Sequence, residues 1–382
     1  MDARILRRHP PAMGQAKGDD FEAARLTVRL DAIAANYRTY CRMTGPCAVA
    51  AVVKADAYGM GAAAVAPALV QAGCDSFFVA RLAEGVALRK FLPAARIFVL
   101  DGCQADAVPA LLTHRLIPAL NSLADIAAWS AAASAAKTTL DAVIHVDTGM
   151  NRLGLGPDEL AILSGQSAKR LAGLNVVLMM SHLACADEDS KMNGEQLSRF
   201  RQALAMLPPA PASLAASHGA FLGMEYHFDL VRPGVALYGA NPQNTAQNLM
   251  QTAAIVTGKV LQVRRIDRGD SVGYAATFRA KRPTMLATVA LGYADGIPRS
   301  LSNTGAAAIH GARADIVGRV SMDLITLDVT DMEVNPGDEA EILGETITLG
   351  EVAASAGTNE YEILTRLRRM PRVYEGTTGK DS

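Results

Sequence analysis

Eight short apolar segments between residues 46 and 240 most constrain how this chain can fold. They read PCAVAAVV, SFFVA, RIFVL, LIPAL, LDAVIHVD, LNVVLMMSH, PASLAAS and HFDLVR. The longer segments between them repeat apolar residues at helical spacing. This alternation indicates βα units and a parallel sheet, and eight units are the number that a closed (β/α)₈ barrel requires. An open doubly wound sheet is the alternative, because a strand count from one sequence is easily off by one or two.

From about residue 250 the pattern changes to alternating apolar and polar residues between Gly and Asp turns, as in TMLATVALGYADG and GDEAEILGETITLG. Such alternation is typical of antiparallel strands. We therefore predict an α/β chain with a (β/α)₈ TIM-type barrel over 21–250, a C-terminal mainly antiparallel β domain over 251–382 and a flexible tail over 1–20. The segment LTVRLDAIAANYRTY near the start predicts a strand and a helix outside the barrel count.

The charge balance points to small-molecule chemistry. The 382 residues include 37 basic and 38 acidic side chains, so no basic field is available to hold nucleic acid or an anionic membrane. No window is apolar enough to span a bilayer, and the polar N-terminus does not read as a signal peptide. The five scattered cysteines offer neither a disulfide framework nor the paired spacing of a zinc site. We therefore expect a reducing, cytoplasmic setting and no metal.

Unusual polar residues stand at the ends of the predicted barrel strands. They are Lys54 at the first segment, His145 and Asp147 at the fifth with Arg152 just beyond, His182 at the sixth, Ser217 at the seventh and Arg232 at the eighth. Singly, each has a structural explanation, because strand-end lysines extend to solvent and lone histidines are usually satisfied core residues. Together they favour a functional site, since barrel enzymes place their chemistry at the carboxyl ends of the strands.

Lys54 follows the apolar run in AVVKADAYGMG. An amine at an apolar strand end is disfavoured as an ammonium ion, so its pKa falls and more of it is nucleophilic. Such a lysine is suited to forming an imine with a carbonyl, as in pyridoxal phosphate enzymes. The loops after the last two strands, with Ser217 and the Gly234–Val235 backbone, would supply the phosphate cradle that this cofactor needs.

At this point the motifs resemble those of the alanine racemase family, which are fold-type III pyridoxal phosphate enzymes with a barrel and a C-terminal β domain. AVVKADAYGMG resembles the family's lysine motif, which related decarboxylases and cofactor homeostasis proteins share. The further matches, in the family's order from about residue 25 to 375, are DTGMNRLG, SHLACADE, RPGVALYG, VGYAATF, LGYADG, GRVSMDL and RMPRVY. The resemblance thus covers nearly the whole chain.

The resemblance implies catalytic roles for two residues and contacts with the cofactor ring for two more. Lys54 would hold pyridoxal 5'-phosphate covalently and act as the base on the side of the D-enantiomer. Tyr274 of the partner subunit would be the base on the side of the L-enantiomer, so that a homodimer with shared active sites is expected. Two bases on opposite faces suit racemisation, because one removes the α-proton while the other supplies its replacement. Arg232 would face the pyridine nitrogen, and His182 would lie against the ring and link Arg232 to Tyr274.

The resemblance also implies the residues that hold the rest of the cofactor and the substrate. The cofactor phosphate would be bound by Tyr58, Ser217, Gly234, Val235 and Tyr374. Arg152 would bind the substrate carboxylate, for which its planar fork is suited. Met322 and Asp323, from the partner, would form the substrate side and the entrance, and Tyr293 and Arg299 match the family's pair at the entrance.

Two positions depart from the family pattern. Many members have a lysine in place of His145, and there it is modified to a carbamate that orients the carboxylate-binding arginine. An imidazole cannot form that stable carbamate, so Arg152 must be steered by a bound anion, by an acidic side chain, or not at all. Ala216 stands where an asparagine commonly precedes the serine, which weakens the assignment of Ser217.

The favoured function is interconversion of L-alanine and D-alanine, either to supply D-alanine for peptidoglycan or for alanine catabolism. A broad amino-acid racemase, acting for example on serine, is one alternative. A decarboxylase of the same fold type is another, although such enzymes place a carboxylate where Arg232 stands. A cofactor homeostasis protein without turnover is a third, although such proteins lack the β domain that carries Tyr274.

Overall fold

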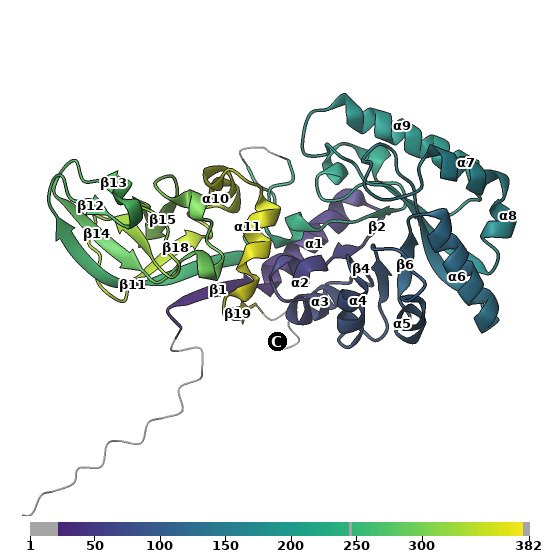
Figure 1. Ribbon diagram of the computed structural model, residues 1–382, viewed down its shortest axis with the longest axis horizontal. Coiled ribbons are helices and arrows are strands. Elements are labelled where there is room, and N and C mark those ends of the chain that lie inside the picture. Colours follow the sequence, from purple (N-terminus) through teal and green to yellow (C-terminus); the bar gives the residue numbers. More distant parts are fainter. Residues whose placement is uncertain (1–21, 244–246, 377–382) are drawn as a thin grey trace, which may run out of the picture.

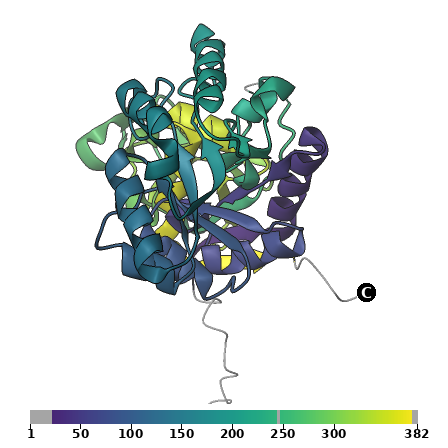
Figure 2. The same cartoon turned by 90° about the vertical axis from the view of Figure 1, so that its right-hand side faces the viewer.

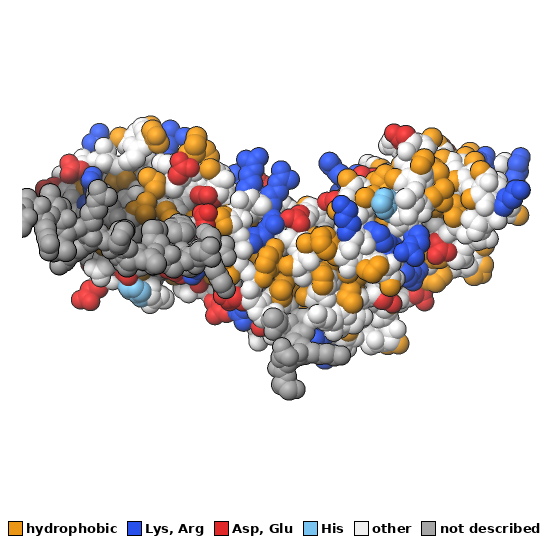
Figure 3. Space-filling view, turned by 90° about the horizontal axis from the view of Figure 1, so that it is seen from below, with side chains coloured by type: hydrophobic (Ala, Val, Ile, Leu, Met, Phe, Trp, Pro, Cys, Tyr) orange, Lys and Arg blue, Asp and Glu red, His pale blue; other side chains and the backbone are white. Residues whose placement is uncertain are grey.

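The computed structural model describes residues 22–243 and 247–376. The predicted tail, 1–20, lies outside the described residues. The molecule is elongated, with a barrel lobe and a β-rich lobe side by side (Figure 1), and its surface is hollowed between them when it is seen from below (Figure 3).

All of the predicted barrel strands are present. They are β2 (Ala48–Val49) and β3 (Ala51–Val52), which form one strand position broken at Ala50, then β4 (Ser76–Val79), β5 (Arg96–Val99), β6 (Ile117–Leu120), β7 (Leu140–His145), β8 (Leu174–Met180), β9 (Ala212–Ser213) and β10 (Leu230–Val231). β3 to β9 pair in chain order, and each pair is parallel. Aromatic and β-branched side chains suit these buried strands.

The sheet closes on itself. β10 pairs in parallel with β2, and a parallel bridge between Ala216 and Arg232 joins the ends of β9 and β10. The eight strand positions therefore form a ring, which is visible end-on with the helices around it (Figure 2). The barrel prediction is confirmed, and the open doubly wound sheet is excluded.

The helices of the barrel lobe alternate with its strands. They are α1 (Leu30–Thr44), α2 (Lys54–Tyr58), α3 (Ala62–Gln71), α4 (Leu82–Arg89), α5 (Val108–Thr113), α6 (Leu123–Ala136), α7 (Pro157–Gly165), α8 (Ser167–Arg170) and α9 (Lys191–Met206), with the short 3₁₀ turns η2 (Gly219–Phe221), η3 (Met224–Tyr226) and η4 (Val235–Tyr238) after the last two strands. The start of α6 follows from its cap, because the Ser122 side chain accepts a hydrogen bond from the N–H of Asp125.

The second lobe is a mainly antiparallel sheet with the order β16-β15-β18-β11-β1-β19, in which β14 pairs with β11 and β17. Its strands are β1 (Ala24–Arg29), β11 (Ala254–Ile266), β14 (Thr284–Val289), β15 (Ala306–Ile309), β16 (Ala312–Asp315), β17 (Ile325–Asp328), β18 (Glu339–Leu343) and β19 (Arg372–Glu375). The hairpin β12 (Ser271–Val272) and β13 (Phe278–Arg279), the turns η5 (Tyr274–Ala276), η6 (Tyr293–Asp295), η7 (Arg299–Leu301) and η8 (Leu367–Arg369), and helices α10 (Leu349–Ala356) and α11 (Glu360–Arg366) complete the lobe.

β1 is antiparallel to β11 and parallel to β19, so the first described strand belongs to the C-terminal sheet. The sequence prediction of a strand outside the barrel count is confirmed, although residues 24–29 fall within the range predicted for the barrel. The expected boundary at residue 250 falls between η4 and β11.

One hydrophobic core runs through both lobes. In the barrel its side chains are mainly aliphatic, with a few aromatic ones, and the rings of Phe78 and Phe98 stack with centroids 4.5 Å apart. No helix of the described chain is long and apolar enough to cross a membrane.

Candidate active site

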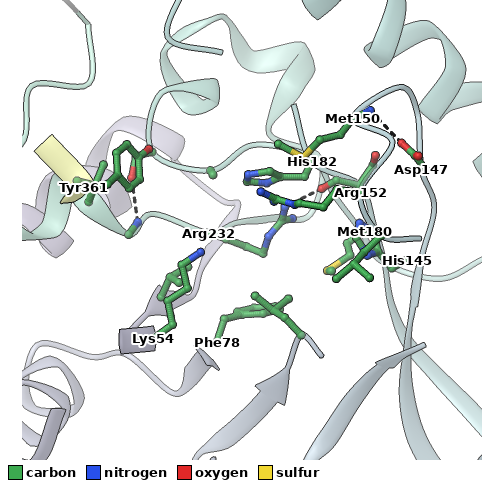
Figure 4. A pocket seen from close by; sticks show the side chains of 18 of the residues that line it. Lys54, Phe78, His145, Asp147, Met150, Arg152, Met180, His182, Arg232 and Tyr361 are labelled. Carbon is green, nitrogen blue, oxygen red and sulfur yellow. Dashed lines mark hydrogen bonds between the residues drawn. The ribbon is translucent and has the colours of Figure 1, made fainter. Parts of the chain in front are cut away.

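A single cavity at the carboxyl ends of the barrel strands collects most of the predicted site residues (Figure 4). Its volume is about 870 Å³ when the space at its open mouth is included. The predicted residues that line it are Lys54, Tyr58, His145, Arg152, His182, Ser217, Arg232, Gly234 and Val235. The barrel thus brings together side chains from across some 180 positions of the sequence, as the strand-end pattern indicated.

Lys54 is aimed into the cavity by an unusual turn. The four residues that follow it, Ala55 to Tyr58, all have positive φ values between 54° and 57°, so α2 is a left-handed turn. Each such non-glycine residue costs about 1–2 kcal/mol, which the surrounding contacts must offset. The Glu84 carboxylate accepts a hydrogen bond of 2.7 Å from the Ala55 N–H, and the Asp56 carboxylate accepts one of 2.8 Å from the N–H of Ala62.

The surroundings of Lys54 favour its neutral amine. Burial lowers the pKa of the Lys54 amine, and the nearby Arg152 charge lowers it further, whereas Glu84 raises it. The side chain points into the space that Arg232 and His182 also face (Figure 4). The amine is therefore placed and tuned to react with a carbonyl, as its apolar lead-in predicted.

Arg232 is buried, with 4% of its surface exposed. Its Nη2 donates to the carbonyl oxygens of Ser181, at 2.7 Å, and Leu214, at 3.3 Å, and its Nη1 donates to the hydroxyl of Ser213. Burial lowers the pKa of Arg232 to about 10, so the guanidinium stays charged at neutral pH. A fixed positive charge therefore faces the cavity.

The two cavity histidines are neutral. Burial lowers the pKa of His182 to about 3, and the charge of Arg232 contributes. Burial and Arg232 likewise lower the pKa of His145 to about 4. Neither ring carries a positive charge near neutral pH, so the positive potential in the cavity comes from its arginines.

Backbone amides and hydroxyls form one end of the cavity. The Ser217 hydroxyl accepts hydrogen bonds from the N–H groups of Gly234, at 2.9 Å, and Ala236, at 3.4 Å. A Cβ atom at Gly234 would lie 2.4 Å from the Tyr58 hydroxyl oxygen, so a glycine here is what lets that hydroxyl lie close to the backbone. Hydroxyl and backbone amide groups gathered at one end of a cavity are suited to binding a phosphate.

A second tyrosine at this end was missed by the sequence reasoning. Tyr361, on α11, lines the cavity, its ring lies 6.2 Å from that of Tyr58, and its hydroxyl is 3.4 Å from Nδ1 of His218. The predicted Tyr374 does not line the cavity, because it lies on β19 with its hydroxyl against Gly61. Both tyrosines stand in the same C-terminal stretch, and only the path of α11 over the barrel distinguishes them.

The remaining predicted residues share a different surface. Tyr274, Tyr293, Arg299, Met322 and Asp323 lie on the C-terminal lobe and do not line the cavity. Tyr274, Met322 and Tyr293 are exposed to 70%, 54% and 39%. We call these five residues the C-terminal patch.

Backbone hydrogen bonds tie the loops of this patch together. The N–H groups of Tyr293 and Ala294 donate to the carbonyl oxygens of Ser321, at 3.0 Å, and Met322, at 2.9 Å. The side-chain amide of Asn303 donates to the Thr277 hydroxyl, and its Oδ1 accepts from the N–H of Gly318. Asn303 therefore links the loops that contain Thr277 and Gly318. Hydrogen bonds therefore hold the loops that carry the C-terminal patch in place relative to one another.

Comparison with known proteins finds matches to both lobes of the chain. Residues 28–242 match the family model for the alanine racemase N-terminal domain, and residues 253–374 match that for the alanine racemase C-terminal domain. The chain is 46% identical over 380 residues to the catabolic alanine racemase of Agrobacterium fabrum, covering 98% of this chain and 96% of the relative. It is 48% identical over 365 residues to the alanine racemase of Rhodospirillum rubrum, covering 94% and 97%.

Solved structures also match most of the chain. The alanine racemase of Bartonella henselae with covalently bound pyridoxal phosphate matches with a TM-score of 0.89 at 41% identity, over 93% of this chain and 100% of that one. The biosynthetic alanine racemase of Pseudomonas aeruginosa matches with a TM-score of 0.87 at 35% identity, over 93% and 100%.

Proposed function

This chain belongs to the alanine racemase family, and from that premise we propose that it interconverts L-alanine and D-alanine with pyridoxal phosphate held at Lys54. The observation that carries the proposal is the cavity itself. It combines a partly buried amine of lowered pKa, a fixed guanidinium at Arg232 and a cradle of hydroxyls and amides.

The residues of the cavity fit this cofactor. Lys54 would hold its carbonyl carbon, and Arg232 would face its ring nitrogen. Ser217, the Gly234 backbone and Tyr361, which line one end of the cavity, would hold its phosphate. When bound, pyridoxal phosphate withdraws electrons from the α-carbon of an amino acid, which makes the α-proton removable.

The chain's own residues would then move the proton. Lys54 takes or returns it on the D side, where a base with a lowered pKa is effective near neutral pH. Arg152, which lines the mouth of the cavity, holds the substrate carboxylate with its planar fork. Arg232 keeps its own proton, because its pKa of about 10 leaves it charged, and so it does not protonate the ring nitrogen.

The second base would be Tyr274 of the partner subunit. Within one chain Tyr274 follows β12, at the end of the C-terminal lobe farthest from the barrel (Figure 1), and does not line the cavity. Its C-terminal patch, together with the exposed side chain of Leu324, presents apolar surface of the kind that marks an interface. These observations support a homodimer in which the patch of each subunit completes the cavity of the other.

The proposed setting is the cytoplasm, since all five cysteines are free thiols. Relatives described as catabolic and as biosynthetic both match the chain, so the same activity would serve either alanine catabolism or the supply of D-alanine for peptidoglycan.

Incubation of the purified protein with L-alanine in D₂O tests the function. We expect exchange of the α-proton and formation of D-alanine, followed by NMR and chiral chromatography, and absence of both would refute the proposal. The other L-amino acids, serine included, measured in parallel, define the substrate range. The Tyr274→Phe variant should retain the cofactor yet lose racemisation, and unchanged activity would refute the role of Tyr274.

Mixed dimers test the shared site. Co-expression of Lys54→Ala and Tyr274→Phe chains in equal amounts should restore about a quarter of the wild-type activity per active site, because half of the dimers are mixed and each contains one intact site of two. Each homodimeric variant alone is the control. No restoration in verified mixed dimers would show that Lys54 and Tyr274 act within one chain.

A further inference from the structure

Three neighbouring barrel strands are linked at their carboxyl ends by a buried polar chain that the proposed mechanism does not use. Asn121, just after β6, donates from its Nδ2 to the carbonyl oxygen of Leu100, just after β5, at 3.0 Å. Its Oδ1 lies 2.7 Å from Nδ1 of His145, at the end of β7. Asn121 and His145 are 8% and 9% exposed. Each buried polar group here is matched to one partner, as burial demands.

These hydrogen bonds, from Leu100 through Asn121 to His145, fix the tautomer of His145. A backbone carbonyl can only accept, so the amide of Asn121 must turn its NH₂ group to Leu100 and its oxygen to His145. That oxygen also only accepts, so Nδ1 of His145 carries the hydrogen. A neutral imidazole carries a single ring hydrogen, and Nε2 is therefore left with a lone pair and no hydrogen.

The Cδ2 edge of the His145 ring faces the loop that carries Arg152. Nδ1 points to Asn121, whereas Cδ2, which is bonded to Nε2, lies on the opposite edge of the ring, where a Cβ at Gly154 would be only 3.2 Å away. The N–H of Leu155 donates to the carbonyl oxygen of His145 at 2.8 Å, which brings the loop back onto β7. His145 and Arg152 both line the same cavity (Figure 4).

One carboxylate oxygen of Asp147 is used within this loop. Oδ1 of Asp147 accepts from the backbone N–H groups of Gly149 and Met150, each at 2.9 Å, and of Asn151, at 3.2 Å. Asp147 thus shapes the loop, whereas the exposed Arg152 side chain makes no hydrogen bond or ion pair with the described residues. Ordering a free arginine costs about 2 kcal/mol in side-chain entropy, so an acceptor already in place lowers the cost of gripping a substrate.

We infer that His145 is a positioning residue: its Nε2, held unprotonated by Asn121, accepts a hydrogen bond from the Arg152 guanidinium and sets that fork for the substrate carboxylate. The acceptor is a neutral ring nitrogen and does not depend on a captured anion. The inference rests on the proposed function only in assigning the carboxylate to Arg152.

Two replacements of His145 separate its two nitrogens. The His145→Gln side chain can place an amide oxygen near the position of Nε2, and His145→Asn can instead place an amide nitrogen near that of Nδ1. Binding of propionate, a carboxylate without an amine, to the cofactor-loaded enzyme reports on Arg152 without turnover, through the cofactor absorbance. Methylamine, which has no carboxylate, is the control ligand.

We expect His145→Asn to weaken propionate binding on the order of tenfold and His145→Gln to stay within about threefold of the wild type, because the lost bond is to a charged donor. Methylamine should bind all three proteins alike. The KM for alanine should rise in His145→Asn more than kcat falls. Equal propionate affinity in all three proteins, or a loss that is the same for methylamine, would overturn the inference.

The tautomer can be measured without any variant of the site. In ¹⁵N NMR of histidine-labelled holoenzyme, the ring assigned to His145 should show a protonated Nδ1 and an unprotonated Nε2 from pH 6 to 9. A protonated Nε2 would overturn the inference even if both variants failed to fold. Failure of the wild type to bind propionate or to exchange the α-proton of alanine would instead refute the proposed function.

Discussion

Replacement of Gly234 by alanine should weaken the binding of pyridoxal phosphate while leaving the fold intact. The added Cβ would lie 2.4 Å from the Tyr58 hydroxyl oxygen, 3.1 Å from its Cζ and 3.3 Å from Cβ of Val52. An ordinary contact is about 3.5 Å, so the tyrosine would have to retreat by about 1 Å. Tyr58 is only 4% exposed, and its ring lies 5.0 Å from that of Tyr238, so it has no free space to enter.

Overpacking of this kind costs about 1–3 kcal/mol. If the cofactor-binding arrangement carries that cost, the dissociation constant rises roughly 5- to 150-fold. Titration of the cofactor-free protein with pyridoxal phosphate, followed by absorbance, measures it, and thermal unfolding of the same samples checks the fold. Gly156→Ala is the matched control, since no atom lies within 4 Å of its added Cβ. A Gly234→Ala protein that binds the cofactor as tightly as the wild type would refute the phosphate site.

Three further predictions concern the cavity. Tyr361→Phe should weaken pyridoxal phosphate binding by about tenfold and Tyr374→Phe should not, because only Tyr361 lines the cavity; equal losses in the same titration would contradict that placement. Burial lowers the pKa values of His145 and His182 to about 4 and 3. Just below pH 6.5, each of these histidines therefore takes up a proton in the unfolded chain but not in the folded chain. The free energy of unfolding in urea should therefore fall as the pH drops from 6.5 towards 4, less so in His145→Gln, and a constant value would argue against burial as neutral rings. In cofactor-free protein, Lys54 should react with pyridoxal at a lower pH than the surface lysines do, because its pKa is lowered. The product can be trapped with borohydride and located by mass spectrometry. The same pH dependence of labelling for Lys54 and the surface lysines would contradict this prediction.

The strand-end pattern predicted the barrel and most of its rim. Parallel strands of one barrel all end at the same edge, so a polar residue at the end of each apolar run must lie near the others. Lys54, His182 and Arg232 could be assigned to one site for that reason alone, and the structure brings them together. The chemistry of the lysine also followed from its apolar lead-in, because burial acts on the pKa wherever the chain places the amine.

Loop and helix residues could not be placed in this way. Tyr361 and Tyr374 are both exposed to about 40% and stand in one C-terminal stretch, yet only the first reaches the cavity, because α11 crosses the barrel mouth whereas β19 pairs with β1. No periodicity in the sequence reports which element covers which face. The left-handed turn after Lys54 is also invisible in the residues Ala55 to Tyr58, since none of them favours positive φ and only tertiary contacts hold them there.

The sequence by itself determined the architecture, the lysine chemistry and the family, because hydrophobic period and strand-end position are local properties of the chain. The tertiary structure decided which tyrosine lines the cavity and which ring nitrogen of His145 lies against Asn121. Both depend on contacts between segments far apart in the chain. The amide of Asn121 turns its oxygen to His145 because its nitrogen donates a hydrogen bond to the carbonyl oxygen of Leu100, just after β5.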